Sequence, residues 1–151
     1  MAPPAAPPAG PVALGTTAGR WVLLATVLAS AMAMLDATAV TVALPAIGAE
    51  FGASLSVLQW TVTGYTLALA SLVLLGGALG DRYGRRRVFL VGVVWFALAS
   101  LVCGVAQTGG QLVAARVLQG IGGALLTPGS LAIIQSSFRA GDRARAIGLW
   151  S

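Results

Sequence analysis

Residues 57–87 read VLQWTVTGYTLALASLVLLGGALGDRYGRRR, an apolar run without charge that ends in a cluster of charged side chains. The uncharged part, residues 57–80, is long enough to cross a bilayer as a helix, which takes about 20 mostly apolar residues. The charged part, residues 81–87, holds one aspartate and four arginines, and basic clusters of this kind remain on the cytoplasmic side of a membrane. The stretch therefore predicts a membrane-spanning helix followed by a cytoplasmic loop.

Other parts of the chain repeat this pattern of an apolar run and a short loop. The expected spans are residues 21–44, 57–80, 88–106 and 111–134, and a fifth begins at about residue 146. Pro45 is expected to end the first span, because the residue before a proline avoids the helical conformation. Of all residues 58% are hydrophobic and 9% are charged, against about 25% charged in soluble domains. The predicted fold class is therefore an all-α integral membrane protein.

The distribution of arginines predicts how the spans are oriented. Every arginine except Arg116 lies before the first span, between the second and third, or after the fourth. Short arginine-rich loops stay in the cytoplasm, so we expect a multi-pass protein of the plasma (inner) membrane with a cytoplasmic N-terminus. Residues 1–19, which are rich in proline, alanine and glycine, are expected to form a disordered cytoplasmic tail. Residues 20–151 are expected to form an incomplete N-terminal transmembrane bundle.

The side chains that carry metal or covalent chemistry are scarce. The sequence has no histidine, and its one cysteine, Cys103, lies inside an apolar run. A metal site needs several such ligands, and a membrane-embedded enzyme needs a nucleophile with a base. We therefore expect no metal, no cofactor and no enzymatic activity. The arginines behind the net charge of +5 lie between the spans and do not form a nucleic-acid-binding face.

The segment Gly77–Arg87, GALGDRYGRRR, resembles the loop between the second and third helices of the major facilitator superfamily, G-x-x-x-D-R-x-G-R-R-[RK]. Gly77 lies one helical turn before Asp81 and leaves room for a neighbouring helix, while Gly84 permits a tight turn. The resemblance implies a cytoplasmic conformational gate held by Asp81 and Arg85. The expected gate residues are Gly77, Asp81, Arg82, Gly84, Arg85, Arg86 and Asp142, the last being the acidic candidate near the end of the fourth helix. A simpler interpretation is that these charges only orient the loop.

A second segment, Arg116–Gly122, RVLQGIG, resembles the fourth-helix motif R-x-x-Q-G-x-G of the same superfamily. An arginine inside the bilayer costs ~2.5–3.5 kcal/mol on insertion scales and therefore needs a partner. Asp36 lies ~12 Å from the outer end of the first span, and Arg116 lies ~7.5 Å from the outer end of the fourth. We predict that Asp36 and Arg116 pair in the outer half of the membrane. The carboxylate of Asp36 then either takes up and releases a proton, as proton-coupled transport requires, or is purely structural.

A third segment, Leu35–Pro45, LDATAVTVALP, resembles the first-helix pattern L-D-x-T-x-V-N-x-A-L-P of the 14-helix drug:proton antiporter branch, with Thr41 in place of asparagine. The resemblance implies proton-coupled efflux of drugs or other small amphipathic molecules by alternating access. This chain is then expected to be a fragment that works with protons, its substrate, the lipid bilayer and the remaining helices of the full-length transporter. The possible substrate-cavity residues are Gln59, Thr63, Tyr65 and Gln119. The alternatives are a metabolite or sugar transporter of the same superfamily, or an inert membrane-assembly fragment.

Overall fold

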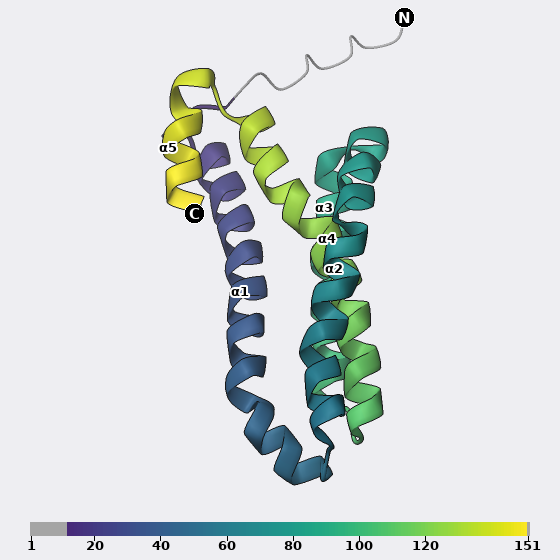
Figure 1. Ribbon diagram of the computed structural model, residues 1–151. Coiled ribbons are helices and arrows are strands. Elements are labelled where there is room, and N and C mark those ends of the chain that lie inside the picture. The colour runs from purple at the N-terminus through teal and green to yellow at the C-terminus, as the bar shows by residue number, and fades with distance from the viewer. Residues whose placement is uncertain (1–11, 151) are drawn as a thin grey trace, which may run out of the picture.

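A computed structural model describes residues 12–150, which fold into five α-helices and no sheet (Figure 1). Their bounds are α1 Thr17–Phe51, α2 Leu55–Tyr83, α3 Arg85–Gly104, α4 Gly109–Ser137 and α5 Ala140–Trp150. The first four are long and apolar enough to cross a membrane. The predicted all-α, multi-pass membrane fold is therefore confirmed.

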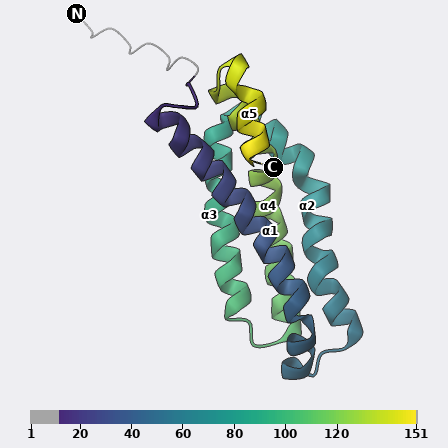
Figure 2. The ribbon, with the colours of Figure 1, turned by 90° about the vertical axis from the view of Figure 1, so that its left-hand side faces the viewer.

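Helix α4 is the centre of the packing. It contacts α2 and α3 along much of its length, and α1 to a smaller extent (Figures 1 and 2). It also has more buried residues than any other described helix. By contrast, α1 buries only Gly19, Thr26 and Ala29, and large apolar side chains such as Leu28 and Met34 are exposed along it. In a bilayer such faces lie against lipid tails or other helices.

Glycines set how closely α2 and α3 approach α4. A Cβ atom at Gly76 of α2 would collide with the carbonyl oxygen of Ala124, and one at Gly92 of α3 would lie 2.8 Å from a backbone nitrogen of α4. Small residues of this kind let helix backbones touch within a membrane. Gly77, to which the sequence assigned this role, has more space, because its Cβ would lie 4.0 Å from the Cβ of Pro128. The close approach therefore falls one residue earlier than predicted.

The helices extend further than the predicted spans. Helix α1 continues through Pro45 to Phe51, so the expectation that Pro45 ends this helix was wrong. Membrane helices tolerate proline, which bends them, and α1 bends toward its lower end in Figure 1. At ~1.5 Å per residue its 35 residues extend for roughly 52 Å, well beyond a hydrocarbon core of ~30 Å. The helices therefore include residues beyond the apolar runs that defined the predicted spans.

A single residue, Gly84, separates α2 from α3. Its φ of +98° is a conformation that residues with a Cβ rarely adopt. The tight turn that the sequence predicted at this glycine is present. It lets α3 begin at Arg85, three residues before the predicted start of the third span.

The segment before α1 is ordered in its described part. The N–H of Val12 donates to the carbonyl oxygen of Ser137 at 2.7 Å, and residues 12–16 lead directly into α1. This corrects the predicted disordered tail over residues 12–19; residues 1–11 lie outside the described part of the chain. Composition alone favoured disorder, because it does not report hydrogen bonds to distant backbone.

Helix α5 begins at Ala140, earlier than the predicted residue 146, and lies beside α1 (Figures 1 and 2). Phe138 and Ala146 are buried together with the end of α4. The indole N–H of Trp150 donates to the hydroxyl of Ser30 at 2.8 Å. The α4–α5 connection is therefore anchored to the first half of α1.

Candidate functional site

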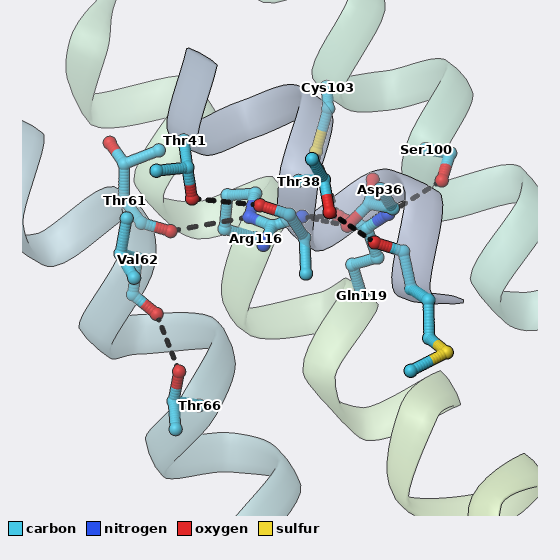
Figure 3. Close-up of polar contacts among 12 residues, drawn as sticks. Asp36, Thr38, Thr41, Thr61, Val62, Thr66, Ser100, Cys103, Arg116 and Gln119 are labelled. Carbon is cyan, nitrogen blue, oxygen red and sulfur yellow. Dashed lines mark hydrogen bonds and ion pairs between the residues drawn. The ribbon is translucent and has the colours of Figure 1, made fainter. Parts of the chain in front are cut away.

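Asp36 of α1 and Arg116 of α4 form a buried ion pair in the interior of the helix bundle (Figure 3). The Nη1 of Arg116 lies 2.5 Å from the Oδ2 of Asp36. The Arg116 side chain is 2% exposed and that of Asp36 is 18% exposed. The pairing predicted from the sequence is thus present, and the carboxylate is the more accessible partner.

Helix α2 supplies further contacts to the guanidinium. The Nε of Arg116 donates to the carbonyl oxygen of Thr61 at 3.2 Å. The ring of Tyr65 lies beneath the guanidinium carbon, with 4.3 Å between that carbon and the ring centroid. A cation over an aromatic face is stabilised by the ring quadrupole, most strongly where water is excluded. Groups from α1 and α2 therefore both contact the buried guanidinium of Arg116.

Gln119, one helical turn after Arg116, connects the ion pair to α3. Its Nε2 donates to the Oδ1 of Asp36 at 2.7 Å and to the Oγ of Ser100 at 2.6 Å (Figure 3). Its Oε1 accepts from the Nη1 of Arg116 at 2.5 Å and from the Sγ of Cys103 at 3.6 Å. We refer to one set of side chains from α1–α4 as the polar cluster: Asp36, Tyr65, Ser100, Cys103, Arg116 and Gln119.

Two members of the polar cluster were not predicted from the sequence, Ser100 and Cys103. Both lie in the predicted third span, where a hydroxyl or thiol is compatible with a lipid-facing or a buried position. Their place in the cluster depends on the rotation of α3 about its own axis relative to α4. The only available sequence signal was that Ser100 is polar within an apolar run, which does not indicate a partner.

The four residues predicted to line a substrate cavity fall in two separate places. Gln59 and Thr63 line a hollow of about 470 Å³ with Leu44 of α1 and other residues of α2. Tyr65 and Gln119 belong to the polar cluster, where Gln119 is fully buried. The described residues therefore do not bring the four side chains into one cavity.

The charged loop contains a second ion pair, between Asp81 and Arg85. The Nε of Arg85 lies 3.0 Å from the Oδ1 of Asp81, across the junction of α2 and α3. The side chains are 44% exposed for Arg85 and 67% exposed for Asp81. Both line a cavity of about 140 Å³ between α2, α3 and α4 that also includes Gly77 and Pro128. Arg82, Gly84 and Arg86 are exposed around this pair.

Asp142, the remaining predicted gate residue, has a different partner. Its Oδ2 accepts a hydrogen bond from the N–H of Leu14 at 3.1 Å. Asp142 lies in the first turn of α5, which begins close to the segment that precedes α1. In this conformation its described contact is with the N-terminal segment and not with Asp81 and Arg85.

The fold and the polar cluster define a class of protein: a multi-pass membrane protein with a buried ion pair between its first and fourth helices. The sequence matches the profile of the Major Facilitator Superfamily over residues 26–151. The chain therefore belongs to the Major Facilitator Superfamily, as its motifs indicated.

Similar proteins include transporters and resistance proteins of Streptomyces. The chain is 48% identical to the probable actinorhodin transporter of Streptomyces coelicolor over 97% of the chain and 27% of that protein. It is 44% identical to the puromycin resistance protein of Streptomyces alboniger, over 86% of the chain and 26% of that protein. It is also 44% identical to the tetracenomycin C resistance and export protein of Streptomyces glaucescens, over 85% of the chain and 24% of that protein. The chain thus spans about a quarter of the length of these relatives.

Proposed function

We propose that this chain provides the first helices of a proton-coupled exporter of drugs or similar small amphipathic molecules. The relatives are named as transporters and as resistance or export proteins, which supports export over uptake of a sugar or metabolite. In this proposal the helices reorient about a site in the membrane, as in other transporters with alternating access. The protein lies in the plasma (inner) membrane.

The observation that carries the proposal is the buried pair of Asp36 and Arg116. A carboxylate inside a membrane marks a functional site by default, and carboxylate chains form proton relays in pumps and transporters. Protonation of Asp36 removes its charge and leaves Arg116, which is 2% exposed, without a counter-charge. A buried charge without its partner is unfavourable by roughly 3–5 kcal/mol. Protonation of Asp36 therefore destabilises the present packing of α1 against α4 and favours a different one.

The pair of Asp81 and Arg85 is proposed to act as the cytoplasmic gate. It is exposed and bridges α2 and α3, so little energy is needed to break it, about 0–1 kcal/mol for a surface pair. That makes it suited to a contact that forms and breaks in each transport cycle. Asp142 is proposed to join this gate only in a conformation in which it has released Leu14.

The proposal is tested by proton-driven accumulation of a fluorescent cationic dye in inside-out vesicles. The vesicles contain the protein expressed from its complete gene, as wild type, Asp36→Asn or Glu50→Gln. Glu50→Gln is a matched control, because Glu50 is exposed near the end of α1 and outside the polar cluster. We expect wild type and Glu50→Gln to accumulate dye and Asp36→Asn to fail. Equal accumulation by all three would mean that Asp36 is structural.

A further inference from the structure

The amide of Gln119 uses its full hydrogen-bonding capacity within the polar cluster. A glutamine amide has two N–H donors and accepts two hydrogen bonds at its oxygen. Both donors are directed at Asp36 and Ser100, and both acceptor positions at Arg116 and Cys103. The residue is fully buried, so water does not replace any of these partners.

The ion pair fixes which way the amide is oriented. A carboxylate only accepts hydrogen bonds and a guanidinium only donates them. The Nε2 of Gln119 must therefore face Asp36, and its Oε1 must face Arg116. With the amide in this orientation, Ser100 faces the N–H side and the Cys103 thiol faces the oxygen.

Protonation of Asp36 weakens the contacts that hold this arrangement. The charged carboxylate accepts from the Nε2 of Gln119 at Oδ1 and from the Nη1 of Arg116 at Oδ2. A hydrogen bond to an ionised acceptor is roughly twice as strong as one between neutral groups. A proton on a free lone pair of either oxygen leaves both bonds in place but removes this charge assistance, so Gln119 is held less firmly between Asp36 and α3.

We propose that Gln119 is a positioning residue that transmits protonation of Asp36 from α1 to α3 through Ser100 and Cys103. The inference rests on the proposed role of Asp36 as the proton-binding group. Among the described residues, Arg116 on α4 pairs with Asp36, and the other titratable groups of the polar cluster are Tyr65 on α2, against Arg116, and Cys103 on α3, against Gln119. The other charges of α1, Arg20 and Glu50, lie near its ends.

Cys103 provides a built-in reporter, because its thiol donates to the Oε1 of Gln119 and it is the one cysteine of this chain. The experiment measures the rate at which methyl methanethiosulfonate modifies Cys103 in membranes at one fixed pH. Asp36→Asn represents the uncharged state, since an amide is similar in shape to the carboxyl group and carries no charge. Cys103→Ser reports modification elsewhere in the protein.

In an otherwise unchanged protein, we expect Asp36→Asn to raise the modification rate of Cys103 roughly fivefold, the size of effect that loss of one ordinary hydrogen bond produces. With Gln119→Met also present, the same change at Asp36 should alter the rate less than about twofold, because the connection to α3 is absent. Gln59→Met is the matched control for a glutamine outside the polar cluster, and it should leave the effect of Asp36→Asn intact. Ser100→Ala gives a second test with a smaller risk to folding, and it should weaken the effect.

The inference would be overturned if Asp36→Asn left the modification rate of Cys103 unchanged. It would also be overturned if Asp36→Asn changed that rate equally with and without Gln119. The readout does not need transport, so the two proposals fail separately. If the reactivity of Cys103 follows Asp36 through Gln119 while Asp36→Asn still accumulates dye, the connection exists and the proton-coupling role of Asp36 is wrong.

Discussion

Arg116 and Arg85 have the same charge and the same kind of partner but opposite surroundings. Arg116 is 2% exposed inside the membrane region, and Arg85 is 44% exposed at a helix junction. A buried pair is strongly destabilised when one partner is removed, because the other charge stays in a low-dielectric interior. A surface pair is screened by water and ions. Replacing each arginine in turn therefore compares how much a buried and an exposed ion pair contribute to the free energy of unfolding.

We predict that Arg116→Met lowers the free energy of unfolding by roughly 3–5 kcal/mol, because Asp36, Gln119 and the carbonyl of Thr61 lose their shared donor. Arg85→Met should lower it by about 1 kcal/mol or less. The measurement is denaturant unfolding of both variants in the same detergent. Equal losses would contradict the assignment of Arg116 as the buried partner of Asp36.

The pairing of Asp36 with Arg116 was predictable from the sequence, because an apolar span leaves a buried charge few partners and their depths nearly match. The contacts of Gln119 with Ser100 and Cys103 were not predictable. They depend on how α3 is rotated against α4, and an apolar run that is hydrophobic on all sides does not indicate which face turns inward.

At the scale of helices, the glycines of α2 and α3 decide how the bundle packs around α4. The sequence predicted a close helix approach at Gly77, next to which lies a second glycine, Gly76. The structure distinguishes them, because only Gly76 lies directly against the backbone of α4 at Ala124.

Replacement of these two neighbours by alanine tests the distinction. Gly76→Ala should destabilise the protein by roughly 1–3 kcal/mol, because the added Cβ collides with backbone that does not move easily. Gly77→Ala should leave stability unchanged or raise it by up to about 1 kcal/mol, because alanine favours helix and the space is available. Melting temperatures in one detergent provide the comparison, and a larger loss for Gly77→Ala would refute the packing of α2 on α4.

The ends of the helices were less predictable than their existence. Hydropathy predicted all four long apolar helices, because a bilayer sets a minimum apolar length. It placed the end of the first span at Pro45, whereas α1 continues to Phe51. Hydrogen bonding holds a helix together beyond the hydrocarbon core, where apolar character is no longer required.

At the scale of the whole molecule, the helix junctions alternate between two ends of the bundle. The α2–α3 and α4–α5 junctions lie at the upper end in Figure 1, and the α1–α2 and α3–α4 connections lie at the lower end. The arginine-rich loops, including Arg85 and Arg139, are both at the upper end. From the positive-inside rule we expect the upper end to face the cytoplasm.

Fusions to alkaline phosphatase, which is active only outside the cytoplasm, test this orientation. We predict activity for fusions after Ser54 and Thr108, at the lower end, and none for fusions after Arg87 and Arg139. The reverse pattern would place the N-terminus outside and would require a different assignment of the gate.

The most direct test of the central claim is the release of protons when a cationic dye binds to the purified protein. The protein is expressed from its complete gene and measured in weakly buffered detergent solution with a pH indicator. If Asp36 carries the proton that is exchanged for substrate, wild type and Glu50→Gln release protons on binding and Asp36→Asn releases none. Proton release by Asp36→Asn equal to that of wild type would contradict the account and place the coupling proton on another group.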